Sequence, residues 1–344
     1  MSAALKVLSA GLHTTVQDLG RQGYQAIGVP VSGALDAPSL RLANRLAGNA
    51  DNTAALEILY QGPTLEVQAA RARVALAGGD ATLELVGERT RAMGGWRSLL
   101  LQQGERFRVS ASSGSACCYL AVEGGIAVAP CLGSAATFTR GGFGGFEGRA
   151  LKSGDLLPLA RADVEERTEL MLEHPPSAAR DQTIRVVLGP QADHFTAAAI
   201  ARFLGSEFRI SKDADRMGAR LEGVKLEHSG GYNIASDGIA TGAIQVPGSG
   251  QAILLLADHQ TTGGYPKIAT VISADLPVAG RRRPGDAVRF AAIGVAEAES
   301  LRRAQEKELQ GLMASLAPAA AGTGLDPARL YSVNLISGAV AGDE

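Results

Sequence analysis

The sequence predicts a mainly β protein made of two successive barrel or sandwich halves with a few helices. Short apolar runs recur along the chain, and glycine, proline, aspartate and asparagine separate them, as is typical of strands joined by tight turns. Glycine accounts for 43 of 344 residues and aromatic residues for 4%, which suits many turns better than a helical bundle. A polar stretch in the middle of the chain separates two halves that each end on a Gly-Asp turn before an apolar run.

The clearest strand candidates are short runs of branched apolar residues bounded by turn residues. Because side chains alternate between the two faces of a strand, neighbouring cysteines in one such run should point in opposite directions. The runs lie at residues 73–87, 117–128, 183–189, 243–248 and 287–294.

Three helices are expected between these strands. Asp36 is a good N-cap, Pro38 suits the first turn, and Gly48 suits the end of a helix whose apolar residues recur on one face. A second helix is expected over about residues 196–204. A third is expected over about 295–316, where leucines recur at helical spacing opposite a charged face.

These elements suggest a division of the chain into four parts. We expect residues 1–160 to form the first half and residues 161–182 a linker. Residues 183–316 then form the second half with its C-terminal helix, and residues 317–344 form a tail.

Composition excludes several classes of function. Lys and Arg total 33 and Asp and Glu total 35, a net charge of −2, whereas nucleic-acid binding favours a basic surface. No basic-then-apolar leader opens the chain, and no apolar run approaches the roughly 20 residues that cross a bilayer. We therefore expect a cytoplasmic protein that binds neither nucleic acid nor membrane.

One polar decapeptide, "DHQTTGGYPK" at 258–267, directly follows the apolar run "AILLLA". Its first residues should sit at a strand end that a packed core supports. Its two glycines allow close approach of a ligand to the backbone, and Lys267 is a cation suited to a carboxylate, a phosphate or an oxyanion. Two further polar segments, 11–36 and 213–223, carry similar residue types.

Other motifs point to structure before function. His259 and His13 lack metal-ligand spacing, and each is more often a hydrogen-bonded histidine than a proton shuttle. The glycine-rich stretch 140–150 lacks the lysine and hydroxyl of a phosphate-binding loop, so we interpret it as a structural loop. Cysteines 117, 118 and 131 suit small buried hydrophobes, and no metal site is predicted.

Taken together, several long motifs resemble the family of the 5-oxoprolinase C subunit. This family is also called allophanate hydrolase subunit 2, the KipA-like proteins or the biotin-dependent carboxyltransferase family. The resemblance covers nearly the whole chain, including the closing "NLISG". The motifs are "TTVQDLGRQGY", "GVPVSGALD", "ANRLAGN" and "AALE" within 14–57, "FGGFEGRALKSGD" at 143–155, "DRMGARLEG" at 215–223, and the stretch 242–276.

The resemblance implies two cyclophilin-like β-barrel domains and a role as one component of a complex. With the A subunit and the KipI-like B subunit of 5-oxoprolinase, the chain would open 5-oxo-L-proline to L-glutamate using ATP, and it would be inactive alone. By motif, the resemblance carries catalytic roles to Asp18, Asp258 and Lys267. It carries substrate-binding roles to Gln17, Arg21, Arg216, Gln260, Thr261 and Thr262.

Two alternatives remain open within the same family. The first is biotin-dependent carboxyl transfer, as in urea carboxylase. Biotin would then reside on another protein, because this chain has no Met-Lys dipeptide and so no usual biotinylation sequence. The second alternative is a KipA-like regulator that acts on a kinase inhibitor, in which case the polar loops would form an interface.

Overall fold

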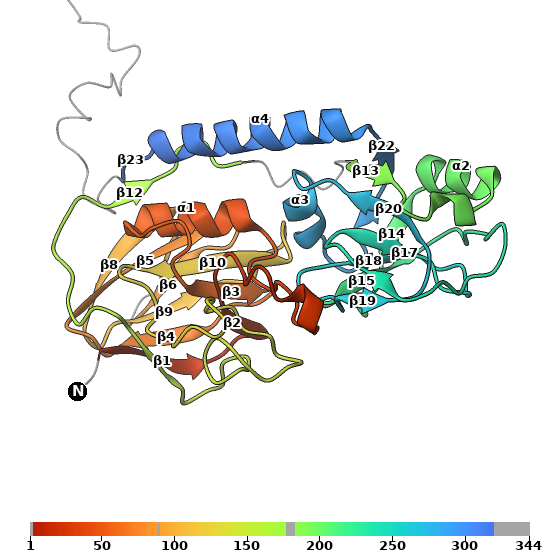
Figure 1. The fold of residues 1–344 in the computed structure, drawn as a ribbon. Coiled ribbons are helices and arrows are strands. Elements are labelled where there is room, and N and C mark those ends of the chain that lie inside the picture. The colour runs from red at the N-terminus through yellow and green to blue at the C-terminus, as the bar shows by residue number, and fades with distance from the viewer. Residues whose placement is uncertain (1–2, 88–89, 177–182, 320–344) are drawn as a thin grey trace, which may run out of the picture.

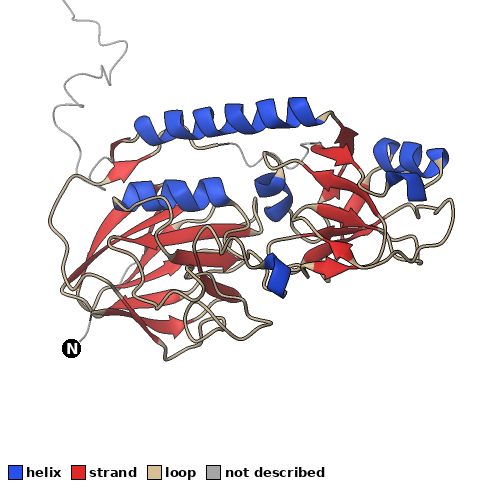
Figure 2. Ribbon diagram, viewed as in Figure 1, coloured by secondary structure: helices blue, strands red, loops and turns tan. Residues whose placement is uncertain are grey.

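The structure is a computed structural model that describes residues 3–87, 90–176 and 183–319. Strands dominate the fold, which confirms the predicted fold class. Two β halves lie side by side beneath one long helix (Figures 1 and 2). Part of the predicted linker, residues 177–182, and the predicted tail from residue 320 onward lie outside the described residues.

The first half stacks two antiparallel sheets around one apolar core. Both sheets contribute fully buried side chains to this core, among them Leu56, Leu83, Phe107 and Leu120. In spatial order, one sheet contains β11 (Leu156–Pro158), β1 (Ala4–Ser9), β4 (Thr64–Val67), β9 (Arg106–Val109), β6 (Leu83–Val86) and β7 (Arg91–Met93). The other contains β2 (His13–Gln17), β3 (Ala55–Leu59), β10 (Cys117–Val122), β5 (Arg71–Ala77), β8 (Arg97–Gln102), β12 (Leu170–Met171) and β23 (Ala317–Pro318).

Strand β10 is buried on both faces, which explains its unbroken apolar sequence. Cys118 and Leu120 point into the core between the sheets, whereas Cys117 and Tyr119 point to the opposite face. The predicted opposite orientation of the two cysteines is therefore confirmed. A second apolar cluster fills the space between this opposite face and the helices above it.

Helix α1 (Ala37–Ala47) covers that face and has the predicted ends. The side chain of Asp36 accepts a hydrogen bond from the backbone N–H of Ser39 at 3.2 Å. Gly48 has a φ of 84°, a left-handed conformation that costs glycine little. Local capping chemistry alone therefore fixes both ends of this helix.

The second half is an eight-stranded sheet that nearly closes into a barrel. Its first and last strands, β21 (Ala287–Val288) and β22 (Phe290–Ala292), are consecutive pieces of one chain segment. β21 pairs with β14 and β22 pairs with β13, so this segment joins the two edges of the sheet. Between them lie, in order, β14 (Phe208–Ile210), β15 (Gly218–Glu222), β18 (Ile253–Leu255), β17 (Ala243–Gln245), β20 (Lys267–Val271) and β13 (Ile184–Leu188).

Smaller elements complete the second half. A two-stranded ribbon, β16 (Asp237–Gly238) and β19 (Thr262–Gly263), lies beside the barrel. The short helix α3 (Leu276–Gly280) was not predicted, because it spans only five residues and has a proline in its first turn. The second half also contains η2 (Ala192–His194) and α2 (Ala197–Gly205). Elsewhere in the chain, η1 (Gln25–Ile27) belongs to the first half, and α4 (Val295–Ala314) is the long helix above both halves.

Helix α4 leaves the second half and returns across the first (Figure 1). Leu309 and Met313 are buried in the apolar cluster above β10. Arg41 of α1 forms a two-pronged ion pair with Glu306 of α4, at 2.8 and 2.9 Å. The long helix therefore holds the two halves together from above.

The described residues carry no sign of a membrane span or a metal centre. Within residues 3–319, apart from the two internal gaps, no helix is long and apolar enough to cross a bilayer. Over the same residues, no three His, Cys, Asp or Glu side chains gather where they would hold a metal ion. All three cysteines have free thiols.

The core between the two sheets generates a stability prediction. Replacing Leu120, which is 0% exposed, with alanine should lower the free energy of unfolding by about 2–5 kcal/mol, because the substitution leaves a cavity. Urea unfolding measures this change. The matched control is Leu156→Ala, at a strand position that is 57% exposed, where we expect a change within about 0.5 kcal/mol. Equal losses for both variants would contradict this core assignment.

Candidate functional site

A buried arginine joins the two halves. Arg216, which is 4% exposed, lies just before β15 in the second half. Its Nε and Nη2 donate to the carboxylate of Asp258 at 2.8 and 3.0 Å, and its Nη1 donates to Glu57 of the first half. Nη2 also donates to the carbonyl of Gly33 at 2.7 Å. We call the boundary defined by Gly33, Glu57, Arg216 and Asp258 the seam.

The charges at the seam stabilise one another. Burial by itself lowers the pKa of Arg216, but Glu57 and Asp258 more than offset burial and raise that pKa above its ordinary value. Removing one partner would leave an unpaired buried charge, which is strongly destabilising. The seam therefore requires all three side chains at once.

Glu57 is held in turn by groups of the first half. Its second oxygen accepts hydrogen bonds from the Tyr119 hydroxyl at 2.7 Å and from the backbone N–H of Leu35 at 2.9 Å. Burial raises the pKa of Tyr119 well above its usual range, so the phenol stays protonated and can donate. The same phenol oxygen accepts from the backbone N–H of Asp36 at 2.8 Å.

The fully buried Asp36 forms a second ion pair across the boundary, with the partly exposed Arg281 of the second half at 3.1 Å. Hydrogen bonds therefore form one continuous chain between the two halves. The chain runs from Arg281 through Asp36, Tyr119 and Glu57 to Arg216.

A polar cleft adjoins the seam. It consists of two cavities of about 450 and 500 Å³ that share Arg140, Met217 and Asp258 in their walls. His13, Leu59, Tyr60, Thr139, Ala214, Asp215 and Arg216 complete the first cavity. Gly28, Pro30, Phe138, His259, Gln260, Thr261 and Thr262 complete the second. Both halves contribute residues to the cleft, and the short helix η1 lies between the two halves (Figure 1).

The start of the polar decapeptide lines this cleft. The backbone N–H of Asp258 donates to the Arg216 carbonyl at 2.8 Å, which holds the segment after β18 beside the segment before β15. Asp258, Gln260, Thr261 and Thr262 then form one wall. The structure thus brings together four residues of the predicted site with Arg216, whose N–H groups are mostly used by the seam.

Lys267 lies behind that wall and lines neither cavity of the cleft. It opens β20 and is 1% exposed. Its Nζ lies 3.3 Å from a carboxylate oxygen of Asp237, an ion-pair distance without the alignment of a hydrogen bond. Gln245, its cross-strand neighbour, accepts a hydrogen bond from the Gln260 side chain at 3.3 Å. Lys267 is thus one layer removed from the cleft.

The predicted residues of the first segment hold a loop and do not line the cleft. Asp18 accepts three hydrogen bonds, from Ser134 Oγ at 2.6 Å and from the backbone N–H groups of Ala135 and Gly20 at 2.7 and 2.8 Å. Gln17 donates to the carbonyl of Thr137 at 3.1 Å.

Arg21 supports the same loop from below. It donates to the Ala136 carbonyl and lies over the ring of Phe143, 5.0 Å from its centroid. Burial lowers its pKa. The loop held by Gln17, Asp18 and Arg21 carries Arg140 into the cleft, so these three side chains position a residue that touches the cavity.

The two histidines occupy different places. His259 is fully buried, with Nδ1 2.6 Å from the Gln260 carbonyl and Nε2 3.1 Å from the Thr241 hydroxyl. His13 lines the cleft, and its Nδ1 has no hydrogen-bond partner among the described residues. Burial lowers the pKa of both imidazoles, and the nearby Arg216 lowers that of His13 further. A neutral imidazole with a free nitrogen can accept a proton.

Three residues of the seam and the cleft were not predicted from the sequence, namely Glu57, Tyr119 and Arg140. Glu57 did leave a signal, because it is a single carboxylate inside the apolar run "AALEILY", where a charge needs a buried partner. Arg140 is the first residue of the glycine-rich stretch 140–150, which we interpreted as structural. Tyr119 lies in an otherwise apolar strand and left no separate signal.

Known proteins share this fold, and their sequences align with most of this chain. The crystal structure of Kluyveromyces lactis urea carboxylase superposes with a TM-score of 0.82 and 30% identity, over 90% of this chain and 29% of that one. This chain therefore spans less than a third of that enzyme. The fold is thus that of one part of a larger carboxylase.

Residues 27–292 match the family described as carboxyltransferase domain, subdomain A and B, and the chain belongs to this family. It is 37% identical to the C subunit of 5-oxoprolinase from Escherichia coli (strain K12) over 308 residues, 90% of this chain and 97% of that protein. It is 35% identical to the C subunit of 5-oxoprolinase from Haemophilus influenzae over 302 residues, 88% of this chain and 95% of that protein. The resemblance found in the motifs is confirmed.

The buried His259 generates a prediction about pH. Its pKa in the folded protein is lowered, so the unfolded chain takes up a proton first as the pH falls through about 6.5, and stability is lost. His13 acts in the same direction. We expect His259→Gln to show a shallower loss of unfolding free energy between about pH 7.5 and 5.5, by up to about 1 kcal/mol per pH unit.

The matched control is His174→Gln, at an exposed position, which should keep the wild-type slope. Urea unfolding at a series of pH values measures both variants. Parallel stability curves for wild type and His259→Gln would show that this imidazole is not the titrating group.

Proposed function

We propose that this chain is the C subunit of an ATP-dependent 5-oxoprolinase that opens 5-oxo-L-proline to L-glutamate together with the A and B subunits. The observation that supports this proposal most strongly is the similarity to the C subunit of the Escherichia coli 5-oxoprolinase over 97% of that protein's length. The chain alone is proposed to be inactive, because the other subunits complete the site. We propose a cytoplasmic location, because the reaction consumes ATP.

The proposed reaction needs activation, because a five-membered lactam is a poor electrophile. Transfer of the γ-phosphoryl group of ATP to the lactam oxygen forms a C–O–P linkage and releases ADP. Water then adds to the same carbon, and the ring C–N bond breaks to give an amine and an acyl phosphate. A second water releases phosphate and completes L-glutamate.

The cleft has groups suited to this substrate. Arg140 lines both cavities, and its Nη1 contacts the sulfur of Met217 at 2.9 Å, with no carboxylate partner among the described residues. We assign it to the substrate carboxylate. The side chains of Gln260, Thr261 and Thr262 offer donors and acceptors for the lactam amide.

His13 is the proposed acceptor of the proton from attacking water, because its imidazole is kept neutral beside Arg216. Asp258 is proposed to set the electrostatic field of the cleft as a fixed carboxylate, since Arg216 engages both of its oxygens. We propose that Lys267 acts indirectly. It pairs across the sheet with Gln245, which accepts a hydrogen bond from Gln260 in the cleft wall. Gln17, Asp18 and Arg21 are proposed to position the loop of Arg140.

A second candidate function is biotin-dependent carboxyl transfer. The structural similarity to urea carboxylase, with a TM-score of 0.82, favours it. It would require a biotinylated partner protein, since this chain contains no Met-Lys dipeptide. The same cleft donors would then stabilise an oxyanion of the acceptor.

The test is reconstitution with the A and B subunits. We expect ATP-dependent release of L-glutamate from 5-oxoproline only when this chain is present. Arg140→Met should raise KM for 5-oxoproline about tenfold, because the substrate carboxylate loses a charged hydrogen bond. Arg140→Lys, which keeps the charge, should retain much of the affinity, and co-purification checks that both variants assemble.

Two results would reject the proposal. One is unchanged glutamate release when this chain is left out of the complex. The other is the absence of 5-oxoproline turnover together with a biotinylated partner that streptavidin detects and carboxylation of an acceptor, which would favour the second candidate.

A further inference from the structure

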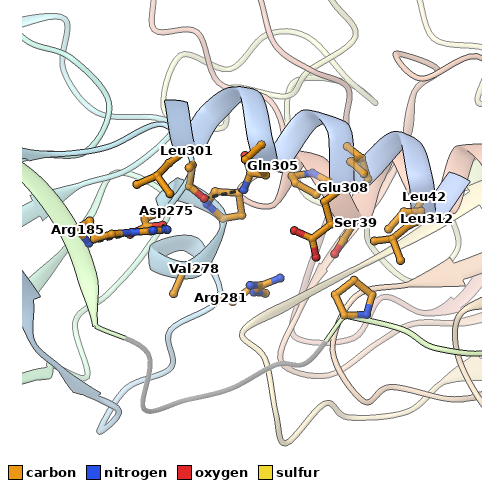
Figure 3. Close-up of a pocket in the computed structure, with 16 residues that line it drawn as sticks. Ser39, Leu42, Arg185, Asp275, Val278, Arg281, Leu301, Gln305, Glu308 and Leu312 are labelled. Carbon is orange, nitrogen blue, oxygen red and sulfur yellow. Dashed lines mark hydrogen bonds and ion pairs between the residues drawn. The ribbon is translucent and has the colours of Figure 1, made fainter. Parts of the chain in front are cut away.

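A cavity of about 410 Å³ lies beneath α4, between α1 of the first half and α3 of the second (Figure 3). It shares no lining residue with either cavity of the cleft. Its volume lies within the range of small-molecule sites, about 300–1,000 Å³. None of the proposed chemistry uses it.

Arg281 enters this cavity with part of its guanidinium uncommitted. It pairs through Nη1 with the buried Asp36 at 3.1 Å, and no second carboxylate among the described residues binds it. Three other arginines, whose side chains are at most 14% exposed, each bind two carboxylates, whereas the buried Arg21 binds none among the described residues. Arg216 binds Glu57 and Asp258, Arg73 binds Glu123 and Glu169, and Arg41 binds Asp51 and Glu306. Compared with those three arginines, Arg281 has hydrogen-bond donors left for a second carboxylate.

Arg185, the other arginine of the cavity, is different. Its Nε and Nη2 donate hydrogen bonds to the two oxygens of Asp275, at 2.9 and 2.6 Å. Its two-pronged donor edge is therefore already occupied by a carboxylate. The uncommitted donors therefore belong to Arg281.

Glu308 projects from α4 into the cavity from the side facing Arg281 (Figure 3). No ion pair of Glu308 is found among the described residues. Two other carboxylates of α4 do form ion pairs, since Glu299 binds Arg303 and Glu306 binds Arg41 and Arg302. Glu308 is thus an unmatched negative charge at the mouth of the cavity.

The rest of the wall is largely apolar. Leu42 comes from α1, Val278 from α3, and Leu301 and Leu312 from α4, and three prolines add to this surface. An apolar group placed here would be removed from water on several sides, which is favourable.

We propose that this cavity binds an α-amino acid with an aliphatic side chain. The carboxylate binds Arg281, the ammonium group binds Glu308, and the side chain packs against Val278 and Leu301. A simple anion would meet the negative charge of Glu308, and a simple cation would leave the donors of Arg281 unused. A zwitterion satisfies both groups.

Calorimetric titration of the full chain with L-leucine tests the proposal. We expect one molecule to bind per chain. N-acetyl-L-leucine, which lacks the positive charge, and L-leucinamide, which lacks the carboxylate, should each bind about tenfold more weakly or less. The cavity is separate from the cleft, so the outcome does not depend on the proposed enzymatic activity.

Variants on α4 identify the site. Glu308→Gln should weaken L-leucine about tenfold without weakening N-acetyl-L-leucine, and Ala304→Trp should block binding by filling the cavity. Glu299→Gln is the matched control on the same helix and should bind as wild type. Arg281 is left unchanged because it also holds Asp36.

Three results would overturn the proposal. They are no binding of L-leucine to the wild-type chain at about 10 mM, undiminished binding by Glu308→Gln, and equal binding of N-acetyl-L-leucine and L-leucine. Circular dichroism verifies that each variant is folded, so that a loss of binding is assigned to the cavity.

Discussion

Burying a guanidinium costs free energy unless carboxylates pair with it, and Arg216 takes one such partner from each half of the chain. Asp258 comes from its own half and Glu57 from the other. The first half alone would leave Glu57 without a cation, and the second half alone would leave Arg216 with Asp258 as its one carboxylate partner. The relative placement of the two β halves is therefore tied to one electrostatic condition, which Tyr119 and Arg281 reinforce from either side.

The same contacts create the cleft. When Arg216 engages Asp258, the segment that follows β18 is fixed against the segment that precedes β15, and residues 258–262 face the loop that carries Arg140. The side chains that hold this geometry are buried, whereas Arg140 and the threonine-containing wall face the cavity. Support and chemistry are thus divided between two sets of residues, and α4 adds a second link between the halves above them.

Local chemistry explains which features could be predicted from sequence. The caps at Asp36 and Gly48 act within one helical turn, so the ends of α1 were predicted correctly. The start of the decapeptide was expected at a supported strand end because it follows an apolar run, and residues 258–262 do follow β18 and line a cavity. By contrast, sequence identifies Arg21 and Lys267 as cations without showing what surrounds them. Both are buried by tertiary contacts, one beneath a loop and one behind the cleft wall.

Features that depend on distant partners escaped prediction for the same reason. The helical spacing of leucines in α4 shows that one face is apolar, yet it does not show that this face returns to the first half. Glu57 stands out in its apolar strand, but its partner lies 159 positions away. Pairing between such distant residues is determined by the folded structure, and no short sequence motif shows it.

The coupling free energy between Arg216 and Glu57 tests most directly whether this ion pair holds the two halves in place. A double-mutant cycle with Arg216→Met, Glu57→Gln and the combined variant, followed by urea unfolding, isolates the interaction. We predict a coupling free energy of about 2 kcal/mol or more. Additive losses, within about 0.5 kcal/mol, would mean that the two halves are held in place by other contacts.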